Sequence, residues 1–245
     1  MPGTRFERLD VLRGVAIAWM TAFHFCFDLN YFGWIRQNFL VDPAWTVQRT
    51  CIVSLFLFCA GLSQAVAHEQ GLGWPRFWKR WAQVAVCALL VTAGSWFMFP
   101  RSYIFFGVLH GIALMLVIVR LTAGWGRRLW PLGAVAIALP HVVAQLHAMN
   151  PSLEFLNRAP FHWLGLVSRK PLTEDYVPVF PWLGVLWWGV AAGQWLLVHR
   201  REALTGALSR GVAPLAWMGR WSLAWYMVHQ PVLIGVVAGV TTLVR

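Results

Sequence analysis

The sequence predicts an all-α integral membrane protein, built as a bundle of about seven transmembrane helices. Of its 245 residues 59% are hydrophobic and only 12% are charged, and the mean hydropathy is +0.59. A soluble domain carries about a quarter charged residues, so this composition excludes an ordinary soluble fold. Apolar runs of about 20 residues, the length that crosses a bilayer, recur along the chain. These candidate spans are approximately 10–29, 47–67, 78–98, 103–120, 129–147, 178–198 and 221–243.

Two of the spans contain proline at positions that disturb a helix. The fifth span holds Pro131 and Pro140, so it is predicted to be broken or partly re-entrant. Pro231 is predicted to kink the last span and to leave a backbone carbonyl facing a cavity. The longest polar connection runs over 148–177, and 203–219 could form a short interfacial helix. No polar stretch is long enough to fold alone, so we expect a single membrane domain over residues 1–245.

The distribution of basic residues predicts how the helices are oriented. The formal net charge is +11, but the basic residues sit in short loops between apolar runs, which argues against nucleic-acid binding. With the N-terminus inside, the larger share of the 20 Lys and Arg residues falls on the cytoplasmic side. The sequence therefore predicts a multi-pass protein with its N-terminus inside and its C-terminus outside. Tryptophans near the span ends are typical of an aromatic belt.

The first span carries three ionisable residues on one helical face. At about 100° per residue, Arg13 lies roughly 20° from His24 around the helix, and Asp28 lies roughly 40° from His24. Asp10 falls on the same stripe. Ionisable groups are costly in hydrocarbon and usually serve chemistry or transport. The alternatives are a structural core histidine, an interfacial aspartate, and an arginine that snorkels to the lipid headgroups.

Two further histidines lie at membrane depth in other spans. His110 is about 10 Å below the outer surface, nearly the depth expected for His24. His229 lies about 12 Å along the last span and shares a helical face with Ser222 and Tyr226. Either histidine could line a chamber or simply be structural. The four cysteines form no C-x-x-C pair, so we expect no metal site.

The spacing in the first span suits a long substrate with a phosphate at one end. A histidine backed by a carboxylate can act as a general base. Arg13 is separated from His24 by about 16 Å of helix rise. A phosphate group docked at the basic end could therefore deliver a reactive group on an extended arm to the histidine, which is the shape of acyl-coenzyme A.

Several stretches resemble the membrane acetyltransferases related to heparan-α-glucosaminide N-acetyltransferase. The first is RFERLDVLRGVAIAWMTAFHFCFDLNYFG, in which an arginine and a histidine separated by ten residues also resemble the wider acyltransferase-3 group. The others are FLFCAGLSQAVA (57–68), YIFFGVLHGIALM (103–115), DYVPVFPWLGVLWWG (175–189) and GRWSLAWYMVHQPVL (219–233).

The resemblance implies a transmembrane acyltransferase-like fold and an acetyl-CoA-dependent O- or N-acetyltransferase of a bacterial-type inner membrane. Acetyl-CoA or another acyl-CoA would be a co-substrate, with no permanently bound cofactor, and a sugar or glycan-like acceptor would bind at the outer side. An oligomer is compatible with the sequence. The chain has fewer spans than the large lysosomal enzyme and lacks a long lumenal domain, so heparan itself is not the expected acceptor.

The resemblance and the spacing together assign roles to eleven residues. His24 would be the general base, or would itself be acylated, and either Asp28 or Asp175 would assist it. Arg13, with Arg80 and Arg220, would hold the cytoplasmic phosphates. The remaining candidates for substrate binding are His110, Tyr176, Trp182, Tyr226 and His229.

Two other functions are open from the residues alone. A proton-coupled transporter could use the same intramembrane His, Asp and Arg side chains as a relay, although no internal repeat is visible. A membrane cytochrome could use His24 and His110 as haem ligands, since both are predicted at similar depth.

Overall fold

The computed structural model describes residues 6–206 and 208–244 and is helical throughout this part, apart from one isolated bridge between Phe106 and Tyr176. The α-helices are α1 (Glu7–Tyr31), α2 (Pro43–Glu69), α3 (Trp74–Met98), α4 (Val108–Thr122), α5 (Leu129–Met149), α6 (Val179–His199), α7 (Glu202–Thr205), α8 (Ala213–Arg220) and α9 (Ser222–Val244). Four 3₁₀ helices connect them: η1 (Ala123–Arg128), η2 (Pro151–Asn157), η3 (Ala159–Leu164) and η4 (Arg210–Val212).

Five helical segments of the described chain are long and apolar enough to cross a membrane. They are α1, α2, α3, α9 and the 42-residue segment Val108–Met149, which joins α4, η1 and α5. The protein is therefore a multi-pass, all-helical membrane protein. The count of seven spans and the N-in/C-out orientation stay predictions.

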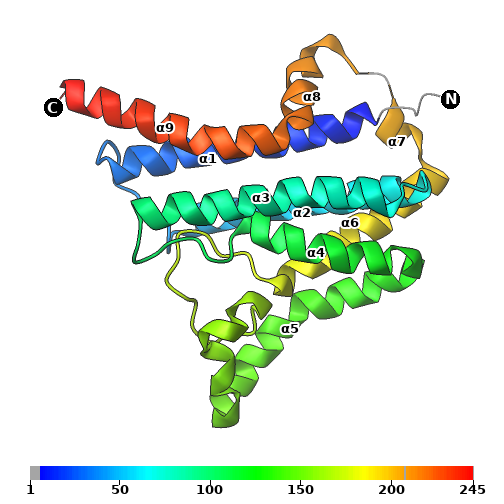
Figure 1. Ribbon diagram of the computed structural model, residues 1–245, viewed down its shortest axis with the longest axis horizontal. Helices are drawn as coiled ribbons and strands as arrows, with labels where there is room; N and C mark the ends of the chain where they lie inside the picture. The colour runs from blue at the N-terminus through cyan, green and yellow to red at the C-terminus, as the bar shows by residue number, and fades with distance from the viewer. Residues whose placement is uncertain (1–5, 207, 245) are drawn as a thin grey trace. The chain divides into compact units, whose positions relative to one another are not determined.

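The long segment Val108–Met149 is not a single rod. Gly126 has φ 58° and ψ −127°, a backbone conformation that glycine adopts without strain. The chain reverses there, so that α5 turns back from the end of α4 (Figure 1). The predicted break in the fifth span is not seen, because α5 is helical from Leu129 to Met149 with Pro140 inside it.

The described chain divides into two compact units, and the boundary falls within α2. The first unit comprises the described residues of 1–56 and 200–245, and the second comprises residues 57–199. The single membrane domain over residues 1–245 stays a prediction.

In the first unit, α1 packs against α8 and α9 (Figure 1). Two glycines let α1 and α8 approach closely, because a Cβ on Gly14 would overlap the backbone of Leu215 and one on Gly219 would overlap the backbone of Asp10. Small residues at helix crossings are the usual means of close packing in membranes. Beside this crossing lies a buried apolar cluster of Ile17, Met20, Phe23, Phe39 and Ile52.

In the second unit, α6 is the central helix and contacts both α4 and α5. Three glycines of α6 lie against two different helices, α5 and α2. A Cβ on Gly184 would overlap the backbone of α5 at Gly133, and a Cβ on Gly189 would overlap the backbone of α2 at Phe58. Gly193 lies against Ala65, also on α2. Because α6 lacks side chains at these points, its backbone can touch two helices at once.

Candidate active site

Two histidines, from α1 and α9, meet inside the first unit. His24 Nδ1 and His229 Nε2 lie 2.8 Å apart, and the two rings stack with their centroids 5.0 Å apart. They come together because α9 runs alongside α1 (Figure 1). His229 is buried and His24 is half-buried. The structure thus joins two residues that the sequence singled out in separate spans.

The hydrogen-bond network fixes where the hydrogen sits on each ring. His229 Nδ1 lies 2.8 Å from the carbonyl oxygen of Tyr226 and 3.2 Å from that of Trp225. Carbonyl oxygens only accept, so Nδ1 of His229 donates, and in the neutral ring its Nε2 is an acceptor. Nδ1 of His24 therefore donates to Nε2 of His229, and the Nε2 atom of neutral His24 carries no hydrogen.

The Nε2 atom of His24 is consequently the basic atom of the pair. It has no hydrogen-bond partner within the part of the chain that the structure describes. A neutral imidazole held in one tautomer, with an unshared electron pair, can take a proton from an O–H or N–H group or attack a carbonyl carbon. The arrangement can therefore support acid–base or nucleophilic chemistry.

A second polar pair lies one helical turn away from the histidines. Gln230 Nε2 donates to Asp28 Oδ1 at 2.8 Å, and Asp28 is buried. We expected Asp28 to orient His24, but the residue in hydrogen-bond contact with His24 is His229. Both side chains instead bond residues of the facing helix, His24 to His229 and Asp28 to Gln230.

A further contact fixes α9 against α1 on the other side of the histidines. Trp225 Nε1 donates to Thr21 Oγ1 at 3.0 Å, and Thr21 in turn donates to the carbonyl of Ile17 at 2.8 Å. This contact lies about one turn before His229. The histidine pair is therefore held between two side-chain bridges, one on each side.

Basic residues gather where α1 crosses α8. Arg13 forms an ion pair with Asp10 at 2.9 Å, and Arg220 lies 3.5 Å from Glu7. Both arginines are partly exposed, so a phosphate could approach them. Arg80, the third predicted phosphate ligand, belongs to the second unit and is exposed on α3.

In the second unit, His110 fastens the start of α4 to α3. Its Nδ1 accepts from the backbone N–H of Gly107 at 3.3 Å, so its Nε2 donates to Thr92 Oγ1 at 3.0 Å. The Thr92 hydroxyl donates its own hydrogen bond to the carbonyl oxygen of Ile104 at 2.8 Å. Both ring nitrogens are therefore used within the scaffold. The prediction that His110 lines a reaction chamber stays a prediction.

Asp175 caps the same helix. Its Oδ2 accepts from the backbone N–H of Val108 at 2.7 Å, which satisfies a donor at the N-terminus of α4 and places a carboxylate at the positive end of the helix dipole. Gly107 makes room for this carboxylate, since a Cβ there would overlap it. The role of Asp175 as an assistant to His24 stays a prediction.

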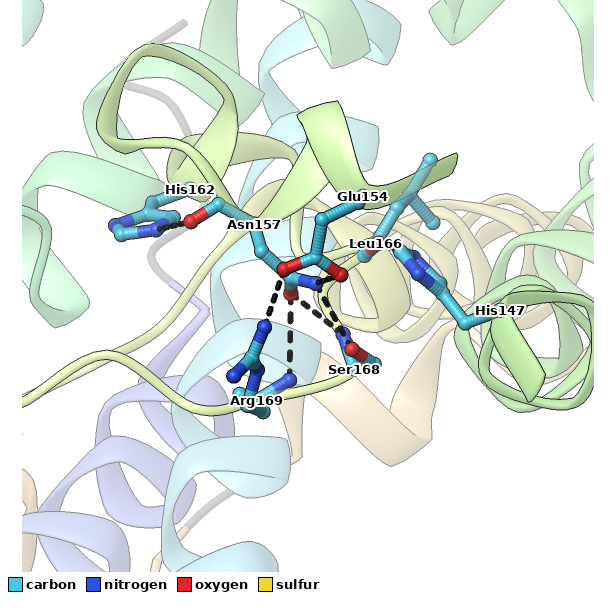
Figure 2. Close-up of polar contacts among 7 residues, drawn as sticks. All are labelled: His147, Glu154, Asn157, His162, Leu166, Ser168 and Arg169. Atoms are coloured by element: carbon cyan, nitrogen blue, oxygen red, sulfur yellow. Dashed lines mark hydrogen bonds and ion pairs between the residues drawn. The ribbon is translucent and has the colours of Figure 1, made fainter. Parts of the chain in front are cut away.

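The segment 150–169 is ordered by polar contacts around one asparagine (Figure 2). Asn157 donates through Nδ2 to Glu154 and to Ser168 Oγ, and its Oδ1 accepts from the backbone N–H groups of Ser168 and Arg169. The hydrogen bond from Asn157, together with the paired Arg169, lowers the pKa of Glu154. His162 bonds the carbonyl of Asn157 at 2.8 Å. These contacts give the long polar connection a defined shape.

Comparison with known families identifies the chain. A family model described as the catalytic part of heparan-alpha-glucosaminide N-acetyltransferase matches residues 5–231. The chain belongs to this family. No curated protein and no solved structure matches it at a significant level. The resemblance seen in the sequence is thereby confirmed over nearly the whole length, and the protein is a multi-pass member of a membrane acetyltransferase family.

The match covers the residues of both units described above. In this member of the family the first unit holds His24, Asp28, Tyr226 and His229, together with Arg13 and Arg220. The second unit holds Arg80, His110, Asp175, Tyr176 and Trp182. The carbonyl oxygen of Tyr226 accepts the hydrogen bond from His229 Nδ1, and the centroid of its ring lies 5.8 Å from that of the His229 ring. Trp182 is half-buried near the start of α6.

Sequence reasoning missed Gln230 and Trp225, which bind Asp28 and Thr21. Both are polar or amphipathic groups within the apolar run that forms α9. Gln230 gave a usable signal, because an uncharged amide deep in a span also needs a hydrogen-bond partner. Trp225 gave none, since tryptophan is frequent throughout this chain.

Tyr176 offers a test of the packing around the second unit's polar connection. Its hydroxyl donates to the carbonyl of His162 at 2.6 Å, and burial raises the pKa of Tyr176 to about 12. An exposed tyrosine ionises near about 10, so stability should fall as the pH rises from about 10 to about 12, where only the unfolded state loses this proton.

The test is the phenolate absorbance of wild type minus that of Tyr176→Phe, measured as the pH is raised. In the folded protein this difference should rise at about pH 12. The same difference measured in denaturant should rise near about pH 10. Equal midpoints in the two conditions would contradict the buried hydrogen bond.

Proposed function

We propose that this protein is an integral inner-membrane acetyltransferase that moves an acetyl group from cytoplasmic acetyl-CoA to a sugar-like acceptor at the outer side. The observation that carries the proposal is the unprotonated Nε2 of His24, fixed by the hydrogen bond of its Nδ1 to His229. Family membership supports the class of reaction. Other acyl thioesters are compatible with the same chemistry.

The chemical step follows from that nitrogen. Nε2 of His24 takes the proton of an acceptor hydroxyl or amine while the acceptor atom attacks the thioester carbonyl carbon. The carbon–sulfur bond breaks, and the imidazolium returns its proton to the leaving thiolate, so that coenzyme A leaves as the thiol. In the alternative order, Nε2 attacks the thioester carbonyl carbon and displaces the coenzyme A thiolate, and the acceptor then takes the acetyl group from Nε2 while its proton passes to that thiolate.

Arg13 and Arg220 are proposed to hold the phosphates of the donor. Both lie at the α1–α8 crossing, and Arg13 precedes His24 by about 16 Å of helix rise, a length suited to the extended arm of coenzyme A. Asp10 and Glu7 orient the two guanidinium groups before the donor binds. Arg80, Tyr176 and Trp182 are further proposed contacts for the donor or the acceptor.

Calorimetric binding of acetyl-CoA to the detergent-purified protein tests this proposal. Arg13→Gln should weaken binding about 10-fold to 100-fold, because a charge-assisted hydrogen bond to phosphate is lost. The matched control is Arg49→Gln, which removes the same charge from an exposed position on α2 and should leave binding within about threefold. Absence of binding to folded wild type, together with solute uptake that needs no coenzyme A, would instead support the transporter.

A further inference from the structure

Two oxygen atoms near the histidine pair have no hydrogen-bond partner. They are Asp28 Oδ2 and Gln230 Oε1, both buried and both unpartnered within the described residues. The two side chains already touch each other through Gln230 Nε2 and Asp28 Oδ1 at 2.8 Å. Asp28 as a whole is only 2% exposed. A buried carboxylate with one accepted hydrogen bond and one unpartnered oxygen is unusual in a folded protein.

The orientation of the amide makes both unpartnered atoms acceptors. Gln230 must turn its NH₂ group toward the carboxylate, because the reverse orientation would place the amide oxygen against a carboxylate oxygen. Its own oxygen is therefore left without a donor, as is Oδ2 of Asp28. A group that satisfies them must donate hydrogen bonds, which selects a hydroxyl or an ammonium and excludes an apolar group or an anion.

Asp28 and Gln230 lie close to His24, whose Nε2 atom is the proposed reacting nitrogen. Asp28 follows His24 by one helical turn on α1, and Gln230 directly follows His229 on α9. Side chains one turn apart on the same helix face have Cβ atoms about 5–6 Å apart. A small molecule with two donor groups separated by a few bonds can thus reach Asp28 and Gln230 with one group and His24 with the other.

We infer that Asp28 and Gln230 form a specificity subsite, which binds a second hydroxyl or ammonium of the acceptor beside the group that is acetylated. The subsite selects acceptors that carry neighbouring hydrogen-bond donors over those that carry a single one. This inference rests on the proposed acetyl transfer and adds the residues that choose the acceptor. Gln230 as a whole is half-buried, whereas its amide oxygen is buried like the Asp28 carboxylate.

A matched pair of probe acceptors tests the subsite. Glucosamine and cyclohexylamine both offer an amine on a six-membered ring, but only glucosamine carries hydroxyls beside it. Wild type should prefer glucosamine by about tenfold or more in kcat/KM, the effect of one good hydrogen bond to a charged group. Gln230→Met, which keeps the length of the side chain and removes its amide, should lower that preference about tenfold.

Asp28→Asn should lower the preference similarly, because it replaces an acceptor oxygen with a donor. Both variants should keep the affinity for acetyl-CoA within about threefold, since the proposed phosphate ligands are Arg13 and Arg220. If Asp28→Asn does not fold, Gln230→Met, which retains Asp28, carries the test alone.

The outcomes separate this inference from the proposed function. If wild type binds acetyl-CoA but acetylates neither probe, both the proposed function and the subsite are overturned. If wild type acetylates the probes but Gln230→Met keeps the full preference, only the subsite is overturned. Infrared spectroscopy gives a further test. A protonated-carboxyl band that is present in wild type and absent in Asp28→Asn would show that Asp28 carries a hydrogen. Asp28 would then donate to the amide oxygen of Gln230 and leave no acceptor for a ligand, which would overturn the subsite.

Discussion

Replacing His24 with alanine should lower acetyl transfer by about 10²-fold to 10⁴-fold, the range expected when a general base is removed. Binding of acetyl-CoA should change little, because the proposed phosphate ligand Arg13 lies about three turns away along α1 and Arg220 lies at the end of α8. The measurement is turnover of acetyl-CoA with an acceptor, beside calorimetric binding of the donor. Normal turnover in folded His24→Ala protein would rule out the catalytic role of this histidine.

The neighbouring His229 provides the matched control for that experiment. His229→Gln offers an amide oxygen where Nε2 stood, so it can still accept from His24 Nδ1 and should retain most of the activity. His229→Leu removes the acceptor and lets His24 adopt either tautomer, so activity should fall by about 10-fold to 100-fold. Equal activity of the two variants would show that the tautomer of His24 does not matter.

Gly219→Ala should destabilise the first unit by about 1–3 kcal/mol, because the added methyl group overlaps the backbone carbonyl of Asp10, which cannot rotate away. α8 would have to move off α1. The control is Gly235→Ala on α9, where a Cβ meets nothing within 4 Å. There alanine should be neutral or should stabilise by up to about 1 kcal/mol through helix propensity.

Thermal unfolding in detergent, followed by tryptophan fluorescence, measures both glycine variants. A lower midpoint for Gly219→Ala alone would confirm the close crossing of α1 and α8. Equal midpoints for the two variants would show that this crossing is looser than the structure describes.

The helices were largely predictable because their signal is local. Each of the seven apolar runs coincides with an α-helix, although the sixth and seventh runs begin one residue before their helices and the fourth begins in the segment before Val108. The sequence reveals length and hydropathy directly, and these are the quantities that decide a membrane helix. Pro140 predicts a break in the fifth run, but a single proline inside a long helix removes one hydrogen bond and need not end it.

The partners of the site residues were harder to predict because they depend on which helices pack together. Spacing along α1 put Asp28 near His24 and suggested that the two pair with each other. The actual partners, His229 and Gln230, lie on α9, more than 200 positions later in the chain. Helical periodicity places residues on a face of one helix, but it carries no information about the register between two helices.

The hydrogen-bond chain that fixes the tautomer of His24 ends on a main-chain atom, the carbonyl oxygen of Tyr226. Every amino acid supplies that oxygen, so no substitution at position 226 can delete it. The tautomer of His24 therefore depends on two histidine side chains and one backbone atom, while the side chain of Tyr226 packs against the buried cluster around Phe23. A substitution of Tyr226 can therefore alter the packing beside the His229 ring, but it leaves the acceptor of the His229 Nδ1 hydrogen in place.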